Sequence, residues 1–348
     1  MLHVDIRKAL GTFHLEARFD AEDGTMALLG ASGCGKSVTL RCIAGILTPD
    51  EGKITLDGVT LFDSAARINL PPQRRQVGYL FQQYALFPHM TVRQNIAAAV
   101  REKSRRPAVV AELLRRMELE AVADLRPFQL SGGQQQRCAL ARILASEPRA
   151  ILLDEPFSAL DSYLRQQLEL ELADTLSAFD GSVVWVSHDR GEVYRNCRRV
   201  CVMDQGRTQA LTDTAALFAH PATEAAARLS GCENFLDVLP DGDAVTIPEW
   251  NVTLSCGGPV TETVRRAGIR ARQVVPARAG DVNALSCTVE RVVEDLRAIT
   301  VLLRPENASA GAPSLRMELN PRAWSDLGAP SRLVVSVAPE DILLFQDL

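Results

Sequence analysis

The sequence lacks three features that mark common protein classes. No apolar run is longer than six residues, even with glycine counted, whereas a membrane-spanning helix needs roughly 20. The eight cysteines include no C-x-x-C pair, which argues against both a disulfide scaffold and a zinc site. The first residues, 1–5, show no charged-then-apolar signal peptide, so we do not expect export.

An excess of positive charge is also missing. Lys and Arg total 38 against 43 Asp and Glu, for a net charge of −5. A protein that binds duplex nucleic acid usually carries a basic stripe, so we expect no nucleic-acid partner. Hydrophobic residues at 47% and charged residues at 23% exclude general disorder, and 348 residues leave room for two domains.

Proline usage and hydrophobic periodicity divide the chain near residue 232. Nine of the 18 prolines follow this point. Apolar residues there recur at every second position: Leu285, Cys287, Val289, Leu315, Met317 and Leu319. Short alternating strands between turn residues predict a small all-β domain over 233–348, barrel-like or OB-like, behind a first domain over 1–232.

The first domain has an α/β pattern. Short apolar runs at 26–29, 151–153 and 183–186 suit buried parallel strands. Between the last two runs, leucines at 164, 168, 172 and 176 recur every four residues, as on the apolar face of a crossover helix. Residues from about 88 to 147 are rich in Ala, Leu and Arg and predict a helical subdomain.

The sharpest motif is a complete GxxxxGK[ST] loop between an apolar run and a helix-like segment. It consists of Gly30, Ala31, Ser32, Gly33, Cys34, Gly35, Lys36 and Ser37. Such a loop wraps its backbone N–H groups around phosphate oxygens, since glycine permits the close approach. Lys36 would neutralise the β- and γ-phosphates and Ser37 would ligate Mg²⁺, so the motif predicts a P-loop NTPase fold that binds ATP and Mg²⁺.

Two acids follow the apolar run at 151–153. Asp154 and Glu155 would lie at the carboxyl edge of the sheet, where open α/β sheets bind ligands. We expect Asp154 to hold Mg²⁺ through water and Glu155 to act as the general base for the attacking water.

A third motif lies 20 residues before Asp154, where residues 130–134 read Leu-Ser-Gly-Gly-Gln ahead of an expected helix over 135–145. Ser131 is the candidate N-cap of that helix. With this motif present, residues 1–232 resemble an ATP-binding cassette (ABC) domain, whose signature is this pentapeptide. The resemblance implies nucleotide contacts for four residues: Ser131, Gly132, Gly133 and Gln134.

The same resemblance assigns roles to three further residues. Gln82 would be the Q-loop glutamine and a third Mg²⁺ contact beside Ser37 and Asp154. Asp161 would belong to the D-loop. His188 would be the switch histidine, which contacts the γ-phosphate and orients the attacking water.

Two positions leave alternatives open. The family usually stacks adenine on an aromatic residue where this chain has Leu10, so Phe13 either replaces that aromatic or belongs to the strand core. Cys34 either makes nucleotide binding sensitive to alkylation and oxidation or points away from the phosphate.

The chain carries one phosphate loop and one signature, whereas the family sandwiches each ATP between the loop of one cassette and the signature of another. The resemblance therefore implies a head-to-tail homodimer, bound to separate permease subunits at the cytoplasmic face of the membrane and served by an extracytoplasmic solute-binding protein. The aromatic and apolar segment 82–90 resembles the groove that receives a permease helix, and could equally be subdomain core. A non-transport ABC ATPase and a regulatory module with little turnover are alternatives that the single cassette, Glu155 and His188 disfavour.

Three weaker likenesses concern the transported solute. Segments 61–75, 187–194 and 281–348 resemble the ATP-binding subunit of importers of molybdate, or of the sulfate/molybdate group. We therefore expect import of molybdate or a related oxyanion, with iron, polyamine or another solute as the alternative. The domain over 233–348 is expected either to bind the oxyanion and restrain the cassettes, or only to dimerise.

Overall fold

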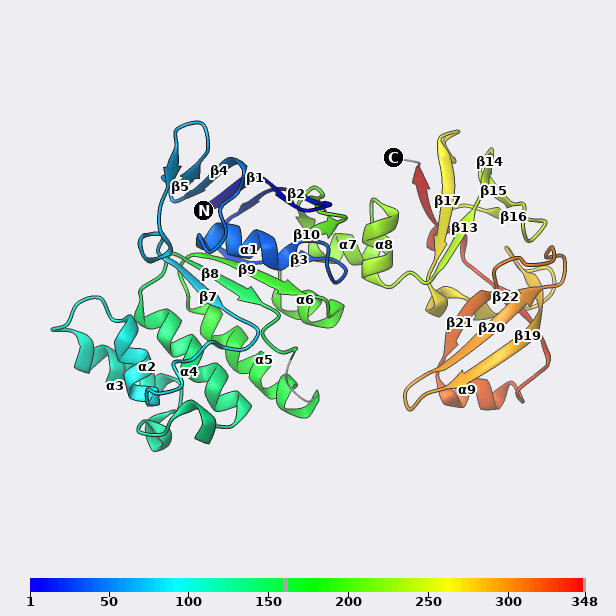
Figure 1. Cartoon of the computed structure of the whole chain (residues 1–348). Helices are drawn as coiled ribbons and strands as arrows, with labels where there is room; N and C mark the ends of the chain where they lie inside the picture. The colour runs from blue at the N-terminus through cyan, green and yellow to red at the C-terminus, as the bar shows by residue number, and fades with distance from the viewer. Residues whose placement is uncertain (159–161, 347–348) are drawn as a thin grey trace. The chain divides into compact units, whose positions relative to one another are not determined.

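The computed structural model describes residues 1–158 and 162–346 and divides into two compact units (Figure 1). The first, here the cassette unit, covers 1–215, and the second, here the β unit, covers 216–348. The boundary expected at 232 falls inside the β unit. Helix α8 (Glu224–Ser230) contacts strand β17 (Val264–Ile269) of that unit, and its Ala227 shares a buried cluster with Cys232 and Phe345.

The described part of the cassette unit is built on a twelve-stranded sheet with an antiparallel and a parallel portion. The antiparallel portion contains β6 (Ile68–Asn69), β5 (Val59–Asp63), β4 (Glu51–Leu56), β1 (Leu2–Leu10) and β2 (Phe13–Ala21). The short β11 (Arg207–Thr208) joins β2 to the parallel portion, and β12 (Thr212–Asp213) pairs with β10 at its side.

The parallel portion carries the expected buried strands. Its order is β10 (Arg199–Asp204), β3 (Gly24–Leu29), β9 (Ser182–Ser187), β8 (Ala150–Asp154) and β7 (Val77–Leu80). Every residue of β8 and β9 is buried, as expected for parallel strands with both faces covered.

Helix α1 (Lys36–Ala44) lies between the antiparallel and parallel strands (Figure 1). Its Leu40 and Ile43 share one core cluster with Leu2 of β1 and Leu152 of β8. The helix ends at Gly45, where φ of 80° closes the last turn without a Cβ clash. The loop before α1 is thus held between two layers of the core.

The expected helical subdomain is present as α2 (Val92–Ala99), α3 (Arg106–Arg116) and α4 (Gly132–Ala145), which gather on one side of the sheet (Figure 1). The predicted crossover helix is α5 (Ser162–Ser177), and its Leu168, Leu172 and Leu176 are buried. Helices α6 (Arg190–Asn196) and α7 (Thr214–Ala219) follow. Among the described residues, no helix is both long and apolar enough to cross a membrane.

The β unit confirms the predicted C-terminal β-domain. Its strands form three sheets around one core: β13 (Asn234–Asp237), β17 and β23 (Leu343–Gln346); β14 (Leu239–Asp241), β15 (Ala244–Ile247) and β16 (Val252–Ser255); and β18 (Val275–Pro276), β22 (Arg332–Ser336), β19 (Leu285–Glu294), β20 (Ile299–Pro305) and β21 (Leu315–Leu319). A short helix, α9 (Pro321–Asp326), follows β21.

The period-two alternation predicts burial correctly at four of the six positions, while Leu319, the last residue of β21, is half-buried. Leu285 and Cys287 of β19 are buried, as are Leu315 and Met317 of β21. Val289 is only half-buried, because the register of β19 against β20 shifts between Val289 and Arg291. A bulge of this kind re-aims the residues that follow it.

Candidate functional site

The phosphate loop runs from the end of β3 to the start of α1. Gly30 has no room for a side chain, since a Cβ there would lie 2.3 Å from the Met203 carbonyl oxygen and 2.6 Å from Cys34 Sγ. Gly33 and Gly35 have φ of 81° and 112°, in the region that favours glycine. The loop therefore turns tightly against the core and ends at the N-terminus of α1, where backbone N–H groups have no partners within the helix.

Lys36 folds back over this loop. Its Nζ donates to the carbonyl oxygens of Gly30, at 2.7 Å, and Ala31, at 2.8 Å, and lies 3.8 Å from Cys34 Sγ. The residue is only 5% exposed. A buried ammonium is thus held directly over a glycine-rich loop at a helix N-terminus, and both features favour a phosphate group.

Asp154 receives hydrogen bonds on both carboxylate oxygens. Ser37 Oγ donates to Oδ1 at 2.8 Å and Tyr79 Oη donates to Oδ2 at 2.7 Å. Burial, together with the charge of Asp154, raises the pKa of Tyr79 far above its usual range, so the phenol stays a donor. The paired Ser37 hydroxyl and Asp154 carboxylate are hard oxygen donors, which fits Mg²⁺.

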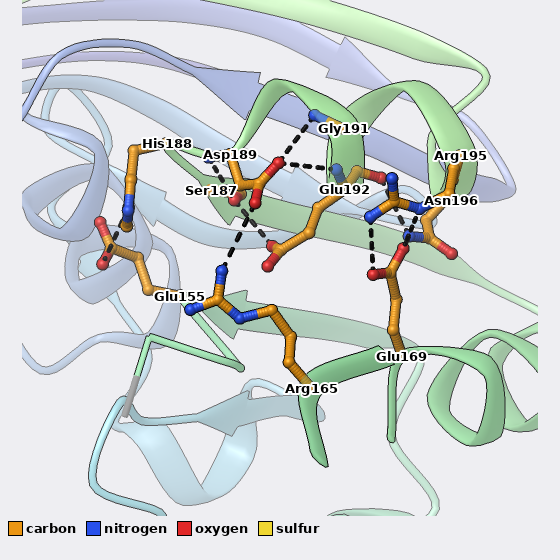
Figure 2. A network of polar contacts seen from close by, with 10 residues as sticks. All are labelled: Glu155, Arg165, Glu169, Ser187, His188, Asp189, Gly191, Glu192, Arg195 and Asn196. Atoms are coloured by element: carbon orange, nitrogen blue, oxygen red, sulfur yellow. Dashed lines mark hydrogen bonds and ion pairs between the residues drawn. The ribbon is translucent and has the colours of Figure 1, made fainter. Parts of the chain in front are cut away.

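Glu155 lies at the turn that ends β8. Its φ of 48° is in the left-handed region, and its backbone N–H donates to the Val186 carbonyl oxygen at 3.0 Å. Glu155 Oε2 lies 3.4 Å from Nδ1 of His188, which follows the neighbouring strand β9. The two residues expected to be catalytic therefore face each other from adjacent parallel strands (Figure 2).

The signature segment forms the N-terminus of α4, which begins at Gly132 rather than at the expected 135. Ser131 is its N-cap: Ser131 Oγ accepts from the Gln134 N–H at 3.3 Å, and Gln134 Oε1 accepts from the Ser131 N–H at 2.9 Å. This reciprocal pair is a capping box. Gly133 faces α5, since a Cβ there would lie 3.2 Å from both Leu168 methyl groups.

Gln82 lies exposed in the turn after β7. Within the described residues its side chain makes no hydrogen bond to Ser37 or Asp154, so the structure does not bring it into their cluster. The chain that follows is fixed by Arg142 of α4, which donates to the carbonyl oxygens of Tyr84 and Ala85. Tyr84 and Ala85 both have positive φ, so this loop is tightly bent as well as anchored.

Buried Asn95 of α2 fixes the second half of the same loop. Its Oδ1 accepts from the Phe87 N–H, and its Nδ2 donates to the carbonyl oxygens of Phe87, Met90 and Thr91. Phe87 itself is 42% exposed, with the Arg142 guanidinium 5.0 Å from its ring centre. The segment 82–90 thus presents an exposed aromatic ring on a rigid loop, a usual feature of protein interfaces.

The positions that the sequence left open differ in exposure. Leu10 is 40% exposed at the end of β1. Phe13 is half-buried, packs against the core, and its Cζ lies 3.0 Å from the point that a Cβ on Gly35 would occupy. Cys34 is buried, and burial raises its thiol pKa although the Lys36 ammonium acts in the opposite direction.

Asp161, the expected D-loop residue, lies outside the described residues.

Two sets of contacts were not predicted from the sequence. Tyr79 completes the Asp154 cluster, and a polar hydroxyl near the end of the apolar run 77–80 was the available signal. Around His188, the side chains of Ser187, Asp189 and Glu192 form a hydrogen-bonded network that reaches Arg165 of α5 (Figure 2). Only the short spacing of Asp189 and Glu192 after His188 pointed to it.

Comparisons with known proteins indicate the family of the chain. The model of the ABC transporter family matches residues 17–158. The spermidine/putrescine import ATP-binding protein PotA of Methylococcus capsulatus is 40% identical over 286 residues, which is 81% of this chain and 71% of that protein. The molybdenum import ATP-binding protein ModC of Paramagnetospirillum magneticum is 38% identical over 226 residues, 64% of this chain and 61% of its own length.

A solved structure resembles the cassette. The ATP-binding cassette MJ0796, dimeric and bound to ADP and Pi in a post-hydrolysis state, superposes with a TM-score of 0.52 at 27% sequence identity. The match covers 62% of this chain and 99% of that one.

Proposed function

This chain belongs to the ABC transporter family, in which it is the ATPase subunit of an importer, and we propose that it powers the uptake of a polyamine. The observation that supports the ATPase part of this proposal is the joint placement of two pairs at the carboxyl edge of one parallel sheet, and the alignment with PotA supports the solute. Ser37 meets Asp154 on β8, and Glu155 meets His188 across β8 and β9.

The phosphate loop would hold the nucleotide's phosphates. The Lys36 ammonium is held at the Gly30 and Ala31 carbonyl oxygens, within the same loop that leads into the N-terminus of α1. Ser37 and Asp154 would hold Mg²⁺, which when bound neutralises phosphate charge. Tyr79 keeps the Asp154 carboxylate in place by occupying its second oxygen.

Glu155 would accept the proton of the attacking water, and His188 would orient that water and the γ-phosphate. The Glu155–His188 contact of 3.4 Å places a carboxylate and an imidazole close enough to share one water molecule. Glu155 is anchored by its own backbone bond to Val186, so its side chain extends from a fixed turn.

The signature residues Ser131 to Gln134 would complete the nucleotide site of a second copy of the chain. Within the described residues, the side-chain hydrogen bonds of Ser131 and Gln134 stay inside their own capping box. A head-to-tail homodimer would bring this helix N-terminus to the partner's phosphate loop, and Gln82 and Asp161 would act at the same closure.

The rigid loop 82–90 would contact the permease. Phe87 is exposed at its tip while Arg142 and Asn95 fix its backbone, so the loop could transmit closure of the dimer without yielding. In this proposal the chain would lie at the cytoplasmic face of the membrane, bound to separate permease subunits and served by an extracytoplasmic binding protein.

Two solutes compete, and the extent of the alignments favours polyamine. The cassette unit holds 215 of the 348 residues, so an alignment over 81% of the chain necessarily enters the β unit, as that with PotA does. The alignment with ModC covers 64% of the chain, which is hardly more than the length of the cassette unit. Molybdate, the solute expected from the sequence, is therefore the second candidate.

Affinity purification of the tagged full chain from the cells that encode it tests the proposal. We expect a permease and a solute-binding protein to co-purify, and the binding protein to bind putrescine or spermidine in calorimetry. Binding of molybdate instead would transfer the proposal to the second candidate. Recovery of ribosomes or DNA without a permease would refute a role in import.

A further inference from the structure

His188 has little packing to fix its side chain. The imidazole is 55% exposed, and Glu155, at 3.4 Å, is its charged neighbour. An exposed ring has few neighbours that fix it, so its position depends on the φ/ψ angles and the placement of the backbone that carries it. The contacts of the residues on either side of His188 therefore decide how well the ring is aimed.

On one side, Ser187 is held by a buried carboxylate. Ser187 Oγ donates to Glu192 Oε2 at 2.8 Å and accepts from the Asp189 N–H at 2.9 Å. Glu192 is only 4% exposed. The hydroxyl thus links both neighbours of His188 to a fixed point on α6 (Figure 2).

On the other side, Asp189 joins two helices. Its Oδ1 accepts from the N–H groups of Gly191 and Glu192, at 2.8 and 3.2 Å, and so caps α6. Its Oδ2 accepts from Arg165 Nη1 of α5 at 3.5 Å. The carboxylate next to His188 is therefore held from both α6 and α5.

A separate contact already joins α5 to α6. Glu169, one turn after Arg165 and only 5% exposed, accepts from Arg195 Nε and Nη2 at 2.8 Å each and from Asn196 Nδ2. This bidentate pair fastens the two helices at a distance from the His188 loop (Figure 2). Arg165 is thus not required to hold the helices together and can serve the loop.

We propose that Arg165 and Glu192 are positioning residues for His188. They act through Ser187 and Asp189, the residues on either side of the histidine, whereas Glu169 joins α5 to α6 without contacting this loop. The proposal rests on the proposed role of His188 in ATP hydrolysis.

Steady-state kinetics of Arg165→Gln and Glu192→Ala in the full chain test it. Misplacement of a catalytic group by about 1 Å can lower turnover by roughly 100-fold. We expect each variant to lower kcat by about 10- to 100-fold while KM for ATP changes less than about twofold, because neither residue contacts the phosphate loop. Glu192→Gln keeps an acceptor for the Ser187 hydroxyl and should restore most of kcat.

Glu169→Gln is the matched control on the same helix. It weakens the contact to Arg195, so it should lower the melting temperature yet leave kcat within about twofold of the parent. If Glu169→Gln lowers kcat as much as Arg165→Gln, packing of α5 on α6 explains both losses and the positioning role is wrong. An unchanged kcat in Arg165→Gln would overturn it as well.

The His188→Ala background separates the inference from the function on which it rests. If Arg165 acts through His188, Arg165→Gln should have no further effect on kcat once the histidine is gone. Equal losses in both backgrounds would show that Arg165 acts elsewhere. Normal turnover by His188→Ala alone would refute the proposed role of His188, independently of Arg165.

Discussion

At the scale of single residues, Glu155 combines a fixed backbone with a carboxylate that faces His188. Its N–H is bonded to Val186, and its Oε2 faces His188. We expect Glu155→Gln to bind ATP as the parent does but to lower kcat by about 100-fold or more, since an amide cannot accept the water's proton. Titration with a fluorescent ATP analogue and a phosphate-release assay measure the two effects.

The Glu155→Gln variant should also accumulate as an ATP-bound dimer, which size-exclusion chromatography with Mg²⁺ and ATP would show. Omission of ATP provides the control. Normal phosphate release by the variant would exclude Glu155 as the general base.

Lys36 is the second residue with a direct prediction. Its ammonium is buried and bonded to two loop carbonyl oxygens. Lys36→Ala removes a charge-assisted contact to phosphate, for which we expect an affinity loss of roughly 10- to 100-fold. Lys53→Ala, which removes a half-exposed lysine paired with Asp63, is the matched control and should leave ATP affinity unchanged. Equal affinities for the parent and Lys36→Ala would remove Lys36 from the nucleotide site.

Cys34 gives a prediction about pH. Burial raises its thiol pKa, so the fraction of reactive thiolate near neutral pH is smaller than for an ordinary cysteine. We expect iodoacetamide to label Cys34 slowly at pH 7 and faster as the pH rises past the ordinary thiol range. Peptide mass spectrometry of the full chain follows the rate, with the less buried Cys256 as the internal reference.

The site residues that could be predicted from the sequence belong to short contiguous motifs. The phosphate loop, Asp154 and Glu155 follow directly from strands and turns that can be read in order. Tyr79 and Arg165 could not be assigned in this way, because each meets its partner only through folding: Tyr79 is 75 residues from Asp154, and Arg165 is 24 from Asp189.

At the scale of elements, hydrophobic periodicity predicted the buried parallel strands and the crossover helix. The buried runs became β3, β8 and β9, and the leucine repeat became α5. The start of α4 was expected three residues late, because two consecutive glycines disfavour a helix until the Ser131–Gln134 capping box compensates for them. The bulge in β19 could not be predicted from the alternation of apolar residues either, because the register of a strand depends on its partner strand.

Helix α1 depends on a buried residue from outside the helix. Arg75 is 1% exposed, and its Nη1 donates to the carbonyl oxygens of Cys42 and Ile43 in the last turn of α1. Its Nε and Nη2 donate to the Leu70 carbonyl oxygen and Asn69 Oδ1. Arg75 therefore fixes the C-terminal end of the helix whose N-terminus holds the phosphate loop.

We expect Arg75→Gln to lower the free energy of unfolding by about 2–4 kcal/mol, since buried carbonyl oxygens lose a charged donor. Urea denaturation followed by circular dichroism measures this. Arg74→Gln, at the exposed neighbouring position, should be nearly neutral. If the two variants unfold alike, the Arg75 contacts do not contribute to stability.

At the scale of the whole molecule, the division of the chain depends on where α8 belongs. The change in composition near residue 232 suggested that the second unit begins after this helix. The structure contains α8 in the β unit, where Glu224 pairs with Arg266 and Arg228 lies 4.0 Å from the Phe235 ring centre. Composition could not reveal this, because α8 has the alanine-rich sequence of a cassette helix while its partners lie on β13 and β17.

Two fragments that differ only in residues 216–232 test the assignment of α8. A fragment over 216–348 keeps the buried cluster of Ala227, Cys232 and Phe345, whereas one over 233–348 exposes Phe345 and leaves Arg266 without Glu224. Loss of these contacts should cost roughly 2 kcal/mol, which for a domain of this size lowers the melting temperature by about 5–10 °C. Differential scanning calorimetry of both fragments measures the difference. Glu224→Gln in the longer fragment isolates the ion pair and should account for only a small part of the difference, since ion pairs that solvent still reaches contribute little. Equal melting temperatures for the two fragments would show that α8 does not stabilise the β unit and belongs to the linker instead.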